Sequence, residues 1–139
     1  MIRRADISDW PEVDRMARAF RDAATPWIGY RPEAMRRTFE GIVESPAGVG
    51  LMPEAGGGVL LAFAMPSPFS GELVAQELLW WIDPQVRGGR TAGAMLAAYE
   101  AWAREVGAAH CGVTCLDERA ARLFGRRGYA RAETIYRVY

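Results

Sequence analysis

Apolar residues recur at every third or fourth position along four segments of the chain, which predicts four amphipathic helices. Residues that are typical of helix ends flank these segments. Asp9 with Glu12 resembles a capping box, Pro32 suits a first helical turn, Gly107 suits a C-terminal end, and Asp117 suits an N-cap. The predicted helices are residues 9–25, 32–45, 94–107 and 117–128.

Short runs of apolar, aromatic and β-branched residues predict the strands. They are residues 1–5, 48–53, 59–65, 78–82 and 109–116, and residues 129–139 supply one or two closing strands. The order β-α-α-β-β-β-α-β-α-β predicts a single α/β domain over residues 1–139, with a mixed central sheet. Antiparallel strands come first, and a β-α-β crossover that allows parallel pairing comes later.

The stretch from Leu78 to Tyr99 has the most informative order. An apolar strand breaks at Asp83-Pro84, and residues 87–93, here called the glycine turn, then lead into the third helix. The first turn of a helix has unpaired backbone N–H groups and a partial positive charge, and small residues let an anion approach them. The turn therefore fits a pyrophosphate, although an ordinary strand-to-helix turn is the alternative, and the spacing of the usual nucleotide loops is absent.

Two motifs in this region resemble those of the GNAT acetyltransferase superfamily. Residues 82–92 read Ile-Asp-Pro-Gln-Val-Arg-Gly-Gly-Arg-Thr-Ala and are similar to its coenzyme A motif, with Arg90 at the position of the usual middle glycine. Residues 117–129 are similar to its pattern Asn-x-x-Ala-x-x-x-Tyr-x-x-x-Gly-Phe/Tyr, through Ala120, Gly128 and Tyr129. Here Asp117 replaces the asparagine, and Phe124 replaces the tyrosine that often serves as general acid.

The resemblance implies an N-acetyltransferase that moves an acetyl group from acetyl-CoA to a primary amine by direct transfer. It also implies that the two central parallel strands splay apart to receive the cofactor. The glycine turn would hold the pyrophosphate, and the backbone of the preceding strand would pair with the pantetheine arm. The cofactor-binding residues implied in this way are Trp80, Trp81, Ile82, Arg87, Gly88, Gly89, Arg90, Thr91, Ala92, Asp117 and Phe124.

A transferase of this kind needs a base for the incoming ammonium group and an acid for the leaving thiolate. Glu77 is the candidate base, because it begins the central strand among apolar residues that would raise its pKa. The alternative for Glu77 is a solvated or salt-bridged glutamate at a strand edge. Phe124 has no proton to give, so Tyr129, Tyr30, Tyr136 or a water molecule are the candidates for the acid.

The contrasting interpretation is a catalytically weak or inactive module with the same fold and a structural role, for example in a phage or phage-like particle. Phe124 favours this interpretation. The acceptor is a small-molecule or protein amine in the first interpretation, and both leave open a homo-oligomer or an assembly partner. With no secretory leader and no apolar run of membrane length, we expect a cytoplasmic protein, or one inside such a particle.

The charge balance and the cysteines bear on two further classes of ligand, nucleic acids and metal ions. Lys plus Arg and Asp plus Glu both number 17, and this balance argues against nucleic acid as the main partner. Cys111 and Cys115 have the spacing of one strand face, where we expect small buried side chains. His110 points to the opposite face and no further ligand set accompanies it, so we expect no metal site.

Overall fold

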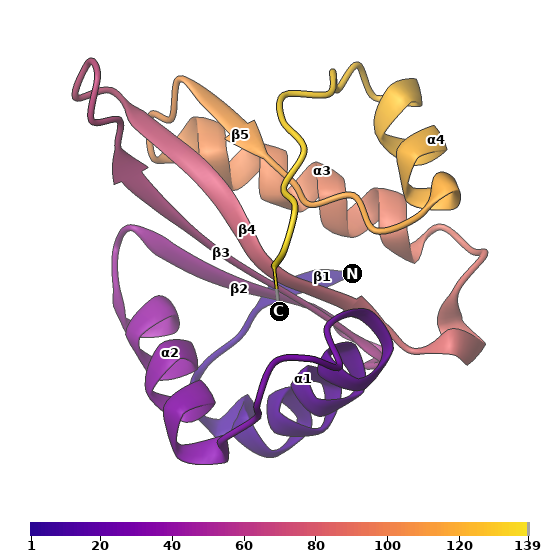
Figure 1. Ribbon diagram of the computed structural model, residues 1–139. Helices are drawn as coiled ribbons and strands as arrows, with labels where there is room; N and C mark the ends of the chain where they lie inside the picture. The colour runs from indigo at the N-terminus through magenta and orange to yellow at the C-terminus, as the bar shows by residue number, and fades with distance from the viewer. Residues whose placement is uncertain (139) are drawn as a thin grey trace.

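The computed structural model describes residues 1–138, which form one five-stranded mixed sheet with helices on both faces (Figure 1). The strand order is β1-β2-β3-β4-β5; the first four strands pair antiparallel, and β4 pairs parallel with β5. The elements are β1 (Ile2–Arg4), the 3-10 turn η1 (Ile7–Asp9), α1 (Trp10–Ala24), α2 (Pro32–Glu44), β2 (Gly48–Pro53), β3 (Gly58–Pro66), β4 (Leu73–Ile82), the 3-10 turn η2 (Pro84–Val86), α3 (Thr91–Glu105), β5 (His110–Gly112) and α4 (Glu118–Arg126).

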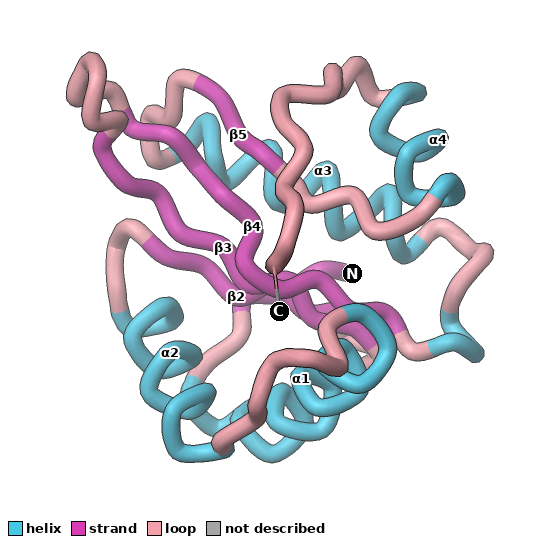
Figure 2. The backbone as a smooth tube through the Cα atoms, viewed as in Figure 1, coloured by secondary structure: helices cyan, strands magenta, loops and turns pink. Residues whose placement is uncertain are grey.

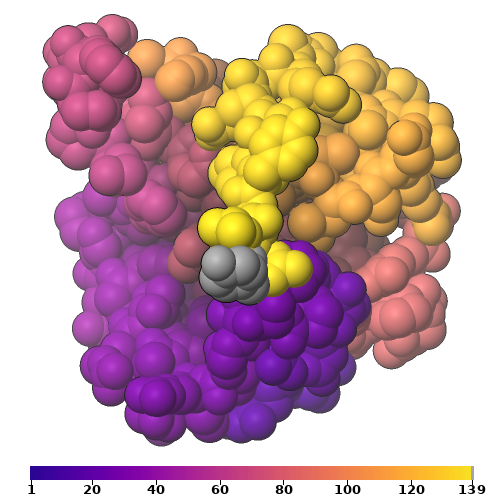
Figure 3. All heavy atoms as spheres, in the orientation of Figure 1, coloured from indigo at the N-terminus to yellow at the C-terminus, as the bar shows by residue number. Residues whose placement is uncertain are grey.

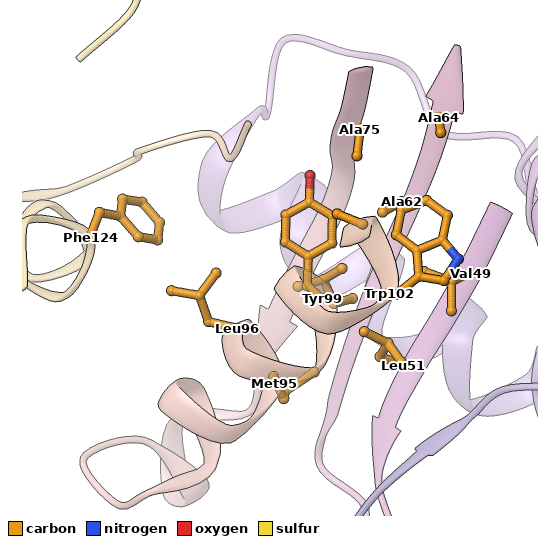
Figure 4. Close-up of a cluster of buried hydrophobic side chains, with 12 residues drawn as sticks. Val49, Leu51, Ala62, Ala64, Ala75, Met95, Leu96, Tyr99, Trp102 and Phe124 are labelled. Atoms are coloured by element: carbon orange, nitrogen blue, oxygen red, sulfur yellow. The ribbon is translucent and has the colours of Figure 1, made fainter. Parts of the chain in front are cut away.

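The helices divide into two layers around the sheet. Figures 1 and 2 show α1 and α2 on one face, and α3 and α4 on the other. Each face has its own cluster of buried side chains, because alternate residues of a strand point to opposite faces. We call these clusters the α3-side core, whose centre is Tyr99 and Trp102 (Figure 4), and the α1/α2-side core, whose centre is Met16 and Phe39.

One extra residue in β4 changes which face its side chains occupy. Leu61 of β3 pairs with Leu79, but the next residue, Ala62, pairs with Glu77, so Leu78 has no counterpart and forms a β-bulge. After the bulge, Trp80 packs against the α3-side core and Trp81 against the α1/α2-side core. The two tryptophans therefore lie on opposite faces, as adjacent strand residues must.

The predicted α/β fold is confirmed, but the predicted strand 109–116 was too long. In the structure β5 ends at Gly112. A short distance further on, the backbone N–H of Thr114 donates to the carboxylate of Glu77 rather than to a sheet neighbour. The two strands separate here, so the ladder cannot continue.

The closing strand is absent from the described part of the chain. Residues 129–138 form no strand, and Tyr139 lies outside the described residues. β5 offers an edge of only three residues to pair with. The segment instead runs across the molecule towards α1, where the guanidinium of Arg137 lies 4.2 Å from the ring centre of Trp27 (Figure 3).

The start of the first helix also differs from the prediction. Asp9 makes no side-chain cap on α1. Its carboxylate instead binds the guanidinium of Arg3 at 2.7 Å and the backbone N–H of Asp6, and the capping box that forms is the one between Asp6 and Asp9 around η1. The carboxylate is occupied by these donors, so α1 begins without it.

Candidate active site

The centre of the site is the point where β4 and β5 part. Their pairing ends at Gln76 and Gly112, whereas β4 continues to Ile82. From Glu77 onward, β4 is hydrogen-bonded to β3 and has no described strand partner on its other side. The sequence therefore places the end of a parallel pair, a bulge and a buried carboxylate within three residues.

Glu77 lies in this opening and is only 5% exposed. Burial raises the pKa of its carboxyl group, and the N–H of Thr114, 2.9 Å from one carboxylate oxygen, partly offsets this effect. Within residues 1–138 no cationic side chain pairs with it. The interpretation as a solvated or salt-bridged edge glutamate is therefore wrong, and the predicted rise in pKa is present.

The glycine turn presents a series of free backbone donors at the start of α3. Within residues 1–138, the N–H groups from Gly88 to Gly93 donate to no protein acceptor, and the first amide with a partner is that of Ala94, which donates to the carbonyl of Arg90. This set includes the amides of Gly89, Thr91 and Ala92. Such amides together with the helix dipole favour an anion, so the geometry fits the predicted phosphate site.

Gly88 gives the turn its shape. Its φ of +91° lies in the left-handed region that side chains disfavour. A Cβ atom at this position would lie 3.2 Å from a guanidinium nitrogen of Arg119 in α4. Arg119 therefore approaches the glycine turn from a distant part of the chain and brings positive charge to it.

The two arginines of the turn behave differently. Arg87 donates from Nε to the carbonyl of Ile82 at 2.7 Å, and its guanidinium stacks on Trp81 at 4.6 Å from the ring centre. Arg87 is thus tied to the end of β4 rather than freely mobile. The guanidinium of Arg90 has no acceptor within residues 1–138 and stays available to a ligand.

An ion pair between half-exposed Arg15 and buried Asp83 holds the end of β4, and sequence reasoning missed it. Asp83 is 5% exposed and accepts from Arg15 of α1 at 2.6 Å and from the indole N–H of Trp81 at 2.8 Å. Hydrogen bonding from Arg15 lowers the pKa of this carboxyl group. The contact fixes the residue that directly follows β4 and so fixes where the strand ends.

The second motif has a structural role in this conformation. Asp117 caps α4 by accepting from the N–H of Ala120 at 2.8 Å, as predicted. Phe124 is 6% exposed and lies between Trp80 and Tyr129, with ring centres 6.0 and 5.6 Å away. Its ring therefore fills the α3-side core near the opening.

None of the candidate tyrosines stands out as the acid. The hydroxyl of Tyr30 donates to Asp14 at 2.6 Å, and that of Tyr129 contacts the Cys111 sulfur at 3.7 Å. Burial raises the pKa of both groups. Tyr136 is almost fully exposed in the C-terminal segment. These contacts assign the role of acid to none of the three tyrosines.

The remaining chemistry-bearing side chains do not form a second centre. Both cysteines are free; Cys115 is exposed and lies beyond the end of β5, so the expectation of two buried thiols on one strand face was wrong for it. His110 is exposed. Within residues 1–138 no three His, Cys, Asp or Glu side chains gather in a way that could hold a metal ion. In the same range no helix is both long and apolar enough to span a bilayer.

A pocket of about 380 Å³ lies on the α1/α2 face, beside the bulge of β4. The C-terminal half of α1, the loop after it, the first turns of α2, and Leu78 with Leu79 form its walls. A second hollow of about 420 Å³ lies between β5, α3 and residues 127–130. The first is lined by Leu78 and Leu79, which lie in β4 just past the end of its pairing with β5.

Comparison with known proteins agrees with this architecture. Residues 14–129 match the model of the acetyltransferase (GNAT) family, so the chain belongs to that family. Its fold supports acetyl transfer in general. A search of curated protein sequences gave no significant match.

Solved structures share the fold at low identity. Ribosomal-protein-alanine N-acetyltransferase from Brucella melitensis biovar Abortus 2308 is 15% identical, with a TM-score of 0.74, over 100% of this chain and 99% of that one. A GCN5-related N-acetyltransferase from Ralstonia eutropha JMP134 is 18% identical, with a TM-score of 0.76, over 100% and 97%. AAC(6')-Iy, in complex with the bisubstrate analog CoA-S-monomethyl-acetylneamine, is 14% identical, with a TM-score of 0.81, over 100% and 96%.

Proposed function

We propose that this chain transfers the acetyl group of acetyl-CoA directly to a primary amine. The observation that carries the proposal is the run of unpartnered amides from Gly88 to Gly93, which starts α3 beside the opening between β4 and β5. These amides, with Arg90 and Arg119 close by, suit the pyrophosphate of the cofactor. The pyrophosphate would bind at the start of α3, and the thioester end of the cofactor would lie between the two separated strands.

The free edge of β4 suits the pantetheine arm. Residues Trp80 to Ile82 have backbone groups on the side that faces away from β3, where β5 no longer pairs with them. The arm would use the amide groups that a neighbouring strand would otherwise use. The carbonyl of Ile82 already accepts from Arg87, so the arm would rely on the other groups of this edge.

Glu77 would take the proton of the incoming amine. In the transfer, the amine nitrogen attacks the thioester carbonyl, the carbon–sulfur bond breaks, and the sulfur leaves as a thiolate. Glu77, directly or through water, accepts the proton that the nitrogen loses, and water protonates the thiolate. A carboxylate whose pKa is raised towards neutrality is a better base for this step than a solvated one.

Release of CoA tests the proposal. The purified chain is incubated with acetyl-CoA and a panel of amines, and CoA is measured by chromatography, because the exposed thiol of Cys115 would react with thiol reagents. Thermal unfolding gives an independent measure of binding. Acetyl-CoA at a hundred times its Kd should stabilise the fold by about 2.7 kcal/mol, or roughly 10 °C in Tm for a chain of this size. An unchanged Tm at millimolar acetyl-CoA would refute cofactor binding and leave the non-catalytic module.

A further inference from the structure

The pocket on the α1/α2 face has a lining that restricts what the acceptor can be. Its wall is mostly apolar, and the large apolar side chains that line it are Phe20, Ile28, Met35, Leu78 and Leu79. Its volume of about 380 Å³ lies near the small end of the range of about 300–1,000 Å³ for ligand pockets. A pocket of this size and lining suits a compact apolar group.

The charged residues of the lining are both arginines, Arg21 and Arg31, and no aspartate or glutamate is among the lining residues. The nearby carboxylates are already engaged: Asp14 accepts from Tyr30, and Asp22 pairs with Arg21. Arg21 also donates to the carbonyl of Ile28 at 2.6 Å, which holds its guanidinium beside the pocket. Because Asp22 compensates the charge of Arg21, the uncompensated positive charge of the lining is that of Arg31, and the lining contains no carboxylate that could bind a cation.

From this lining we infer that the acceptor is a small monoamine on an apolar body, and that diamines and polyamines are rejected. This inference rests on the proposed function, because it assigns the pocket to the acceptor of that reaction. A second ammonium group held about 5 Å from a guanidinium is repelled strongly enough to lower affinity about tenfold or more. The arginines also favour the neutral form of the single amine, which is the form that attacks.

Location supports the assignment to the acceptor. Leu78 and Leu79, which line the pocket, lie in β4 just past the end of its pairing with β5, one and two residues after Glu77. In this assignment the amine enters from the α1/α2 face at the level where the two strands separate, while the cofactor is bound at the start of α3.

A matched pair of amines tests the inference. Hexylamine and 1,6-diaminohexane have the same carbon chain and differ by one ammonium group. Two readouts are used: kcat/KM for each amine with acetyl-CoA, and binding of each amine by calorimetry in the presence of CoA. We expect hexylamine to exceed 1,6-diaminohexane by at least tenfold in both, and neamine to be inactive. Equal or better use of the diamine would overturn the inference.

Two pairs of variants localise the effect. Arg31→Glu should lower the ratio of kcat/KM for hexylamine to that for 1,6-diaminohexane about tenfold or more. Arg37→Glu, in the helix that follows Arg31 but outside the lining, should leave this ratio unchanged. Ile28→Ala should weaken hexylamine binding several-fold, and its control is Ile7→Ala, since the two side chains are 52% and 50% exposed and only Ile28 lines the pocket. A preference that Arg31→Glu does not change would also overturn the inference.

The two readouts separate this inference from the proposed function. If no amine is acetylated but calorimetry shows the preference for hexylamine, the pocket selects monoamines as its lining predicts, and it is the proposed transfer that fails. If diamines are acetylated faster, the proposed function holds and the pocket inference fails. If neither hexylamine nor the diamine binds, the pocket is not an acceptor site.

Discussion

Replacement of Gly88 by valine isolates the contribution of the glycine turn to cofactor binding. Gly88 has a φ of +91°, which costs an L-residue roughly 1–3 kcal/mol, and a β-branched residue is the least suited to it. This cost is smaller than the total stability of about 5–15 kcal/mol of a typical domain, so the variant should fold. The strain, or its relief by a change in the turn, displaces the amides that follow.

The loss in affinity can be worked from those amides. A hydrogen bond to a charged group contributes about 1.5–3 kcal/mol, so the loss of one or two such bonds to phosphate raises Kd by roughly tenfold to twenty-thousandfold. The added side chain also meets the guanidinium of Arg119, since even its Cβ would lie 3.2 Å from a guanidinium nitrogen. We therefore expect Gly88→Val to weaken CoA binding by at least tenfold, measured by calorimetry.

Two glycines provide matched controls. Gly89→Ala places a Cβ in open space at an ordinary φ in the same turn, and should leave the Kd within about threefold. Gly56→Val introduces the same kind of strain at φ +82° in the β2–β3 hairpin, and should lower Tm without changing the Kd. An unchanged Kd in Gly88→Val, or an equal loss in Gly56→Val, would refute the role of the turn.

Three further changes probe the rest of the site. Glu77→Gln should lower kcat by about a hundredfold or more with little change in CoA affinity. Because the pKa of Glu77 is raised in the folded state, the wild type should lose stability relative to the variant as pH rises from the unfolded-state pKa through the folded-state pKa. Urea unfolding at several pH values measures this loss. Arg15→Met should lower the free energy of unfolding by about 1–2 kcal/mol at pH 7. This difference should shrink in acid, because the pKa of Asp83 is lowered and the stabilisation by its carboxylate is lost as pH falls through the folded-state pKa. A difference that is constant with pH would contradict the pairing. Phe124→Ala should cost about 3–5 kcal/mol in urea unfolding, whereas Leu116→Ala, at an exposed position, should stay within about 0.5 kcal/mol.

The local parts of the fold could be predicted from the sequence because they depend on local order. The strand 48–53 matches β2, and the cap at Asp117 lies where the N-cap signal placed it. The third helix is present but begins at Thr91, three residues earlier than predicted, within the glycine turn. β4 begins earlier than predicted, at Leu73, because it pairs along almost the whole of β3 despite the polar residues Gln76 and Glu77. The length of a strand depends on its neighbour, which the sequence of one strand does not contain.

The site could be predicted only in outline for the same reason. Glu77 was singled out because it stands at the start of an apolar run, although a solvated or salt-bridged glutamate at a strand edge stayed open as the alternative. The pairing of Arg15 with Asp83 joins residues 68 positions apart, and Arg119 reaches Gly88 from another helix. No local pattern marks the pairing of Arg15 with Asp83, so this ion pair at the end of β4 was missed.

The bulge at Leu78 makes β4 tolerant of the loss of one residue at this point. Leu79 already pairs with Leu61, and Glu77 already pairs with Ala62, so a strand without Leu78 would keep its register and lose only the bulge. Trp80 and Trp81 would therefore stay in their separate cores. A library that varies the length of this strand should place its one-residue deletion at Leu78.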